Sequence, residues 1–149
     1  MPEHHHQYVR PPYLLLANQF DTASGDVVCV WHLRVAQPGI AAMDQDATHS
    51  VEHWLIYGLR PHGVYQAAPM GCGTGYYIVS PLMEYGEMAR YLADVLQQIV
   101  TASDDNVPWA DDAHCGFADR HSQWGARRIA QWLLLRRDEW PVVGTDVLV

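Results

Sequence analysis

The alternation of apolar and polar positions along the chain predicts two pairs of strands. Residues 13–20 and 27–35 are rich in apolar, β-branched and aromatic side chains, and the turn signal Gly25–Asp26 separates them, so they are predicted to form an antiparallel hairpin. Two shorter strands are predicted at residues 64–68 and 76–80, on either side of a glycine-rich turn. The four segments together predict an antiparallel sheet.

Three further segments carry apolar side chains at helical spacing. They run from residue 44 or 48 to about 60, from 83 or 86 to about 100, and from 121 or 122 to 137. Trp124 and Trp132 of the last segment are predicted to face the core. Because strands and helices do not alternate strictly, we predict an α+β fold, a single domain over residues 1–149 in which helices cover an antiparallel β-sheet.

Composition narrows the class of protein. The chain has 149 residues, 49% of them hydrophobic and six of them tryptophan, which predicts a packed core. The formal net charge of −8 argues against nonspecific nucleic-acid binding, and no stretch is apolar enough to be expected to cross a membrane. Three cysteines, an odd number, argue against a disulfide framework, and no signal peptide is visible. We therefore expect a cytoplasmic protein.

The string HSVEH carries the clearest chemistry. If it is helical, His49 and His53 lie one turn apart on one face and can grip one metal ion, with Glu52 beside them to move protons. This H-x-x-E-H order is typical of inverzincin peptidases. Cys115 is the best candidate for a third ligand, since two histidines and a cysteine suit zinc or ferrous iron and leave one position open. The alternative is that the histidines are ordinary surface residues and the cysteine a buried small hydrophobe.

Two other polar residues, Cys72 and Arg34, support two interpretations each. Cys72 lies between two glycines and can be a reactive thiol or an inert one, whereas Cys29 alternates with apolar neighbours and is predicted to lie in the core. Arg34 ends an apolar strand, where its head can lie in solvent or hold an oxyanion or sugar hydroxyl. The acidic segment 103–112 is expected to be a solvated face. No function is assigned to the isolated histidines His32, His62 and His114.

Four segments in order resemble one family. HSVEHW, APMGCGTGYY and CGFADRHS, with GDVVCVWHLR upstream, are similar to the motifs of the S-ribosylhomocysteine lyase (LuxS) family. The resemblance extends from about His6 to the last predicted helix, and the main difference in length is a shorter stretch between His53 and Cys72. It implies a LuxS fold, related to that of inverzincin-like metallopeptidases.

The resemblance also implies a role for each residue at the centre of the site. His49, His53 and Cys115 would hold one Fe²⁺ or Zn²⁺ per subunit, and Glu52 and Cys72 would be the two acid/base groups. The implied reaction moves a sugar carbonyl by enediolate proton transfers and then expels the thiolate by β-elimination. S-ribosylhomocysteine would give homocysteine and 4,5-dihydroxy-2,3-pentanedione, a step of autoinducer-2 synthesis.

The remaining implied roles concern substrate recognition. His6 and Arg34 match positions that reach the sugar across a homodimer interface, and Arg60 matches a basic position near the amino-acid end of the substrate. Tyr77 falls in the tyrosine pair that closes the glycine-rich motif, and Gln66 stands where the family has an aspartate that helps to hold the homocysteine amine.

Three departures from the family pattern lie at this recognition end. A family serine falls at Met1, another nearby serine is replaced by Ala68, and Gln66 is neutral, so it would bind an ammonium group more weakly than an aspartate. The hypothesis is a divergent member that acts on S-ribosylhomocysteine or on a related thioether sugar with another sulfur substituent. The alternatives are an inverzincin-type metallohydrolase, in which Cys72 would have no role, and a non-catalytic metal-containing protein that binds a sugar thioether.

Overall fold

The computed structural model describes residues 9–142, so the predictions that concern Met1 and His6 lie outside the described residues. The sheet in this part of the chain has the order β1-β2-β4-β3, and every neighbouring pair is antiparallel. Its strands are β1 (Tyr13–Asp21), β2 (Val27–Arg34), β3 (Gln66–Pro69) and β4 (Gly75–Pro81). The predicted hairpin and the two shorter strands are therefore confirmed, with ends that differ by one or two residues.

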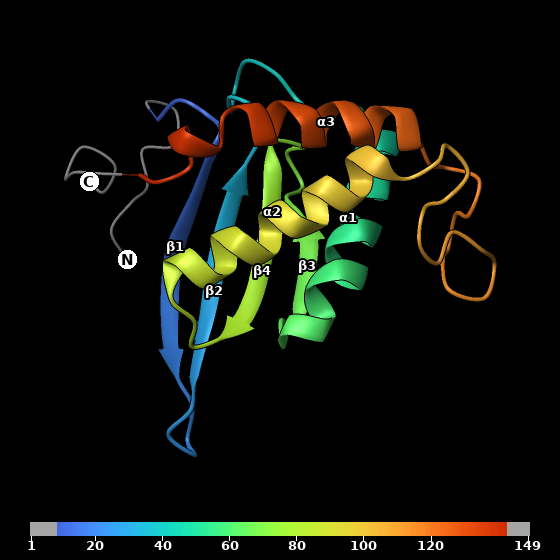
Figure 1. Cartoon of the computed structure of the whole chain (residues 1–149). Coiled ribbons are helices and arrows are strands. Elements are labelled where there is room, and N and C mark those ends of the chain that lie inside the picture. The colour runs from blue at the N-terminus through green and yellow to red at the C-terminus, as the bar shows by residue number, and fades with distance from the viewer. Residues whose placement is uncertain (1–8, 143–149) are drawn as a thin grey trace.

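Three α-helices pack on one face of this sheet (Figure 1). They are α1 (Gln45–Leu59), which continues into the short 3-10 helix η1 (Arg60–His62), α2 (Tyr85–Thr101), and α3 (Gln123–Leu135), which is followed by η2 (Arg137–Glu139). The α+β arrangement of helices over an antiparallel sheet is confirmed. In the part of the chain that the structure describes, no helix is both long enough and apolar enough to cross a bilayer.

Local sequence explains where each helix begins. The Asp44 carboxylate accepts a hydrogen bond from a first-turn amide of α1, and the Ser122 hydroxyl does the same for α3. Glu84 and Glu87 form a reciprocal capping box at the start of α2. These caps satisfy amide groups that have no partner within the helix, so the helices begin where their polar cap residues stand.

The core lies between the sheet and the helices. Alternate residues of the central strands point into it, and Trp31, Leu33, Tyr76 and Ile78 have no exposed surface. Helices α1 and α2 contribute apolar side chains that are equally buried, namely Val51, Leu55, Leu59, Met88, Leu92, Val95, Leu96 and Ile99. On β2 and β4, the residues that alternate with the buried ones point to the opposite face of the sheet, which none of the three helices covers.

The prediction that Trp124 faces the core is wrong. Its side chain is 65% exposed, and Trp132 is only partly buried. The buried residues of α3 are instead Gln123, Ala126, Ala130 and Leu133. Small residues allow α3 to approach α1 closely, and Trp124, two positions before Ala126, falls on the far side of the helix because each residue turns it by 100°.

Candidate active site

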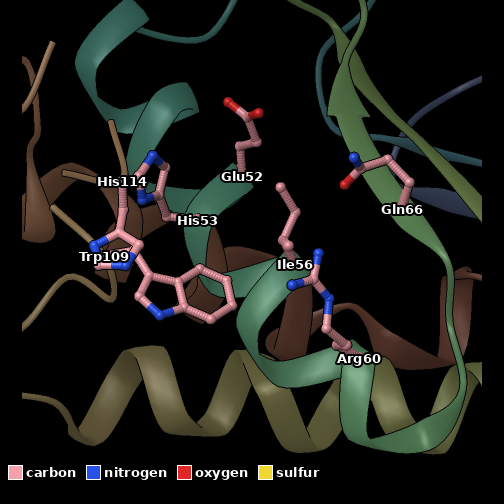
Figure 2. Close-up of a pocket in the computed structure, with 7 residues that line it drawn as sticks. All are labelled: Glu52, His53, Ile56, Arg60, Gln66, Trp109 and His114. Carbon is pink, nitrogen blue, oxygen red and sulfur yellow. The ribbon is translucent and has the colours of Figure 1, made fainter. Parts of the chain in front are cut away.

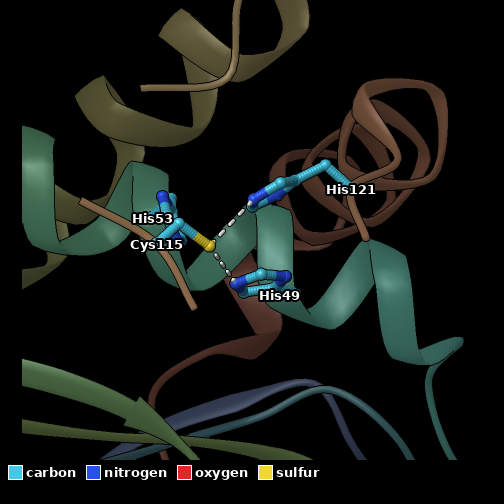
Figure 3. Close-up of side chains that lie close together, drawn as sticks. All are labelled: His49, His53, Cys115 and His121. Carbon is cyan, nitrogen blue, oxygen red and sulfur yellow. Dashed lines mark hydrogen bonds between the residues drawn. The ribbon is translucent and has the colours of Figure 1, made fainter. Parts of the chain in front are cut away.

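Four potential metal-binding side chains meet where α1, α3 and the connection between α2 and α3 come together (Figure 3). His49 and His53 project from one face of α1, Cys115 comes from the connection, and His121 directly precedes the cap of α3. One ligand atom of each residue lies within 4.8 Å of the others. The Cys115 Sγ is 3.3 Å from His49 Nε2 and 3.7 Å from His121 Nε2.

Backbone carbonyls set the orientation of the two α1 histidines. His49 Nδ1 lies 2.7 Å from the Arg120 carbonyl oxygen, and His53 Nδ1 lies 2.7 Å from the Pro108 carbonyl oxygen. A carbonyl can only accept, so each Nδ1 carries a proton, and in the neutral ring Nε2 is the nitrogen left to bind a metal. Two imidazole lone pairs and one thiol are a donor set that fits Zn²⁺ or Fe²⁺ and leaves a coordination position open.

His121 is a member of the cluster that the sequence interpretation did not assign. Its ring stacks on His49 at 3.9 Å between centroids and meets His53 edge-on at 4.6 Å. Burial, followed by the neighbouring His49 and His53, lowers the pKa of His121 to about 4, so the ring is neutral at physiological pH. Its position in the same CGFADRHS segment as Cys115 was the available signal.

Cys72 is exposed on the turn between β3 and β4. Its Sγ lies 2.9 Å from the Thr74 hydroxyl, and this hydrogen bond is the main cause of a lowered pKa for the Cys72 thiol, with a further contribution from the charge of Arg34. The lowered pKa increases the thiolate fraction at neutral pH. The interpretation of Cys72 as a reactive thiol rather than an inert one gains support.

Arg34 is buried, with only 5% of its surface exposed, so the interpretation with its head in solvent is wrong. Its guanidinium donates to the Thr74 hydroxyl at 2.6 Å and to the Tyr13 hydroxyl at 3.2 Å. Because Thr74 accepts from Arg34, its own proton is available to the Cys72 sulfur. Arg34, Thr74 and Cys72 thus form one chain of polar contacts, and these partners allow the charge to be buried.

A pocket of about 420 Å³ adjoins the cluster (Figure 2). Its lining combines charged, polar and aromatic side chains: Glu52, His53, Ile56, Arg60, Gln66, Trp109 and His114. Arg60 lies against the Trp109 ring, with its guanidinium carbon 5.5 Å from the ring centroid, and Gln66 faces the pocket from β3. The predicted residues Glu52, Arg60 and Gln66 are therefore brought together beside a predicted metal ligand.

Adjoining hollows connect this pocket to Cys72. A second hollow contains His49 and Glu52, so it shares Glu52 with the first pocket, and a third contains Cys72. The second and third hollows share Thr48 and Pro69. We call this series of three adjoining hollows the groove; its lining runs from Arg60 and Gln66, past His53 and His49, to Cys72.

Tyr77 and Arg34 are described site candidates that line none of these hollows within one chain. Tyr77 lies apart from them. It is 42% exposed and packs edge-on against His32 at 5.2 Å, on the sheet face that the helices leave uncovered. Conversely, sequence reasoning missed Trp109 and assigned no function to His114, although both line the pocket. His114 is held by Asp111 at 2.8 Å, and this hydrogen bond lowers the pKa of the Asp111 carboxyl.

Comparison with known proteins agrees with this geometry. The family model for S-ribosylhomocysteinase (LuxS) matches residues 3–143. A protein of Dichelobacter nodosus named S-ribosylhomocysteine lyase is 39% identical over 142 residues, which cover 93% of this chain and 90% of that protein. Proteins of the same name from Helicobacter acinonychis and Macrococcus caseolyticus are 33% and 34% identical over 93% of this chain, covering 89% and 86% of their own lengths. This chain belongs to the S-ribosylhomocysteinase (LuxS) family.

Proposed function

We propose that this chain is a carbon–sulfur lyase that cleaves S-ribosylhomocysteine into homocysteine and 4,5-dihydroxy-2,3-pentanedione. The observation that carries the proposal is that the ligand atoms of His49, His53 and Cys115 lie within 4.8 Å of one another, beside hollows that contain Glu52 and Cys72. The names of the relatives support the substrate. The sequence resemblance implied the same reaction and the same residues.

His49, His53 and Cys115 would hold the metal, one Fe²⁺ or Zn²⁺ per subunit. When bound, this ion would supply Lewis-acid stabilisation of the negative charge that develops on sugar oxygens. The carbonyls of Pro108 and Arg120 fix the tautomer of each neutral imidazole, so Nε2 is the atom of each ring that would bind the metal.

Glu52 and Cys72 would be the groups that move protons. The reaction transfers protons between adjacent sugar carbons, and loss of the C4 proton then expels the thiolate from C5. Each step needs a base that takes a proton from one sugar carbon and returns it to the neighbouring carbon. Such groups are needed on more than one face of the sugar. The Cys72 thiol, with its lowered pKa, and the Glu52 carboxylate lie in different hollows of the same groove, which supports this division of work.

The pocket beyond Glu52 would receive the sulfur substituent. Arg60 offers a cation for a carboxylate, as in the resemblance, and Gln66 offers a neutral amide where the family has an aspartate. A neutral amide lacks the charge-assisted hydrogen bond to an ammonium group. Gln66 is therefore the residue at which this chain can accept a related thioether sugar with an altered substituent.

A homodimer would complete the site. The uncovered sheet face carries Val30, His32, Tyr77 and Val79, and Tyr77 is a site candidate that lines no part of the groove within one chain. Pairing of this face would bury the exposed ring of Tyr77, and the resemblance implies that Arg34 reaches the sugar of a partner's site across such an interface. The free thiols Cys72 and Cys115 support a reducing compartment such as the cytoplasm. We also propose that residues 1–149 form one domain with a metallopeptidase-like fold.

The test is anaerobic incubation of the iron- or cobalt-loaded protein with S-ribosylhomocysteine, with homocysteine release followed by mass spectrometry. Release by the wild-type chain, and its loss in Cys72→Ala with the metal content retained, is the expected result. Near-native release by Cys72→Ala would contradict the acid/base role. Metal-loaded wild-type protein that releases no homocysteine would contradict the substrate, and a sugar isomerised without cleavage would then be sought.

Gln66→Asp is the matched variant for the recognition end. It restores the charge that the family carries without changing the groove elsewhere. We expect it to lower the KM for S-ribosylhomocysteine by about tenfold, which corresponds to the ~1.4 kcal/mol that a charge-assisted hydrogen bond can add. An unchanged or raised KM would contradict the assignment of Gln66 to the substrate amine.

A further inference from the structure

His121 differs from the other two histidines of the cluster in the group that faces its Nδ1. For His49 and His53 this group is a backbone carbonyl. For His121 it is the hydroxyl of Ser50, at 3.0 Å. A carbonyl can only accept a hydrogen bond, whereas a hydroxyl can also donate one, so His121 need not share the tautomer of its neighbours.

The surroundings of Ser50 decide which way this hydrogen bond runs. Ser50 lies on α1 with no exposed surface, and its oxygen accepts a hydrogen bond from the Ser122 amide at 2.8 Å. Within residues 9–142 the amide of Ser122 and the ring of His121 are the hydrogen-bond contacts of this hydroxyl. A buried hydroxyl proton needs an acceptor, and among these contacts His121 Nδ1 is the group that can accept it, so the ring proton of His121 stands on Nε2.

That proton faces sulfur. His121 Nε2 is 3.7 Å from Cys115 Sγ, within the reach of a hydrogen bond to sulfur. The ring cannot easily turn away, because it stacks on His49 with an interplanar angle of 21° and packs edge-on against His53 at 80°. An N–H group held in this place stabilises the thiolate that a metal requires.

We infer that His121 is a positioning residue that donates its Nε2–H to the Cys115 thiolate, and that it is not a fourth metal ligand. The inference rests on the proposed function, in which His49, His53 and Cys115 hold the ion. Its consequence is that the fourth coordination position stays open for substrate, as catalytic sites with three protein ligands require. Ser50 has the matching role of keeping His121 in the donating tautomer.

The tautomer can be measured directly in the zinc-loaded full chain. With ¹⁵N-labelled histidine, two-bond ¹H–¹⁵N correlations distinguish a protonated, an unprotonated and a metal-bound ring nitrogen. The expected pattern is Nε2 bound to zinc in His49 and His53, and Nε2 protonated with Nδ1 unprotonated in His121. A His121 ring with Nδ1 protonated and Nε2 bound to zinc would overturn the inference while leaving the metal centre intact.

Two variants at this position test the donor itself. His121→Gln retains an N–H donor near the place of Nε2, whereas His121→Phe retains a stacked ring without a donor. We expect zinc affinity to fall by about 10- to 100-fold in the phenylalanine variant, and its cobalt form to show a thiolate-to-metal absorption band at longer wavelength. The glutamine variant should retain most of the wild-type affinity and band position.

The possible failures separate the two proposals. If His121→Gln and His121→Phe lose zinc affinity equally and the cobalt absorption band does not shift, the ring serves packing alone and the inference is overturned. Wild-type protein that takes up no zinc at a stoichiometry of about one per chain would instead overturn the proposed metal centre.

Discussion

The buried side chain of Gln123 in α3 forms hydrogen bonds to both other helices. We expect the substitution Gln123→Leu to destabilise the fold substantially. The residue is 4% exposed. Its amide oxygen accepts from the Trp54 indole N–H of α1 at 2.9 Å, and its amide nitrogen donates to the Ile99 carbonyl of α2 at 3.0 Å. Since Gln123 begins α3, the same side chain fixes the position of His121 relative to α1.

The magnitude follows from the two groups that the substitution leaves behind. Leucine has a similar size, so the main change is a buried indole N–H and a buried carbonyl without a protein partner. Each such group costs about 1–3 kcal/mol, and the added apolar contact of leucine offsets part of the sum. We expect a loss of about 3 kcal/mol in the free energy of unfolding, which corresponds to a Tm lower by about 6–12 °C for a chain of this length.

The assay is equilibrium urea unfolding of the metal-free protein, at fixed protein concentration and with chelator present, because metal binding and association both shift apparent stability. Gln131→Leu is the control, since Gln131 is an exposed residue of the same helix. A Gln123→Leu variant whose stability lies within about 0.5 kcal/mol of the control would refute the reasoning. The urea dependence of the free energy should be unchanged in both variants.

Three further predictions concern the site and its support. Thr74→Val removes the hydrogen bond that lowers the pKa of Cys72, so the pH profile of Cys72 alkylation should move to higher pH; an unmoved profile would contradict this cause. Gly58→Ala places a β-carbon 2.6 Å from Val95 Cγ2, which should cost about 1–3 kcal/mol in thermal unfolding, recovered in part by adding Val95→Ala. Cys115→Ala should lose bound zinc by elemental analysis, and full retention would reject Cys115 as a ligand.

The periodic parts of the chain were predictable because local sequence and tertiary packing agree there. The hairpin around Gly25 and the cap at Asp44 follow from turn and cap residues that act within a few positions. The pairing of His49 with His53 follows from helical spacing alone. Cys115 is predicted as a metal ligand from its chemistry and from the resemblance, because no local sequence pattern places it beside α1.

The rest of the site could not be predicted because it depends on contacts between distant segments. Trp109 and His114 lie in an irregular connection without periodicity, so their direction toward the pocket is fixed only by its backbone path. Arg34 is buried because Tyr13 of β1 and Thr74, in the turn directly before β4, satisfy its guanidinium. The helical spacing of Trp124 predicts a core position, but small residues such as Ala126 and Ala130 form the buried side of α3, because only they fit the close approach to its neighbours.

The connection between α2 and α3 has a consequence for how fast metal is exchanged. This single segment supplies the Cys115 sulfur and also the carbonyls of Pro108 and Arg120 that orient both histidines. If this segment opens, the ion therefore loses its thiolate ligand, and both histidines at the same time lose the carbonyls that orient them. The rate of metal release, and the access of oxidants to a ferrous ion, should thus follow the local unfolding of residues 102–122 rather than the strength of any one coordination bond.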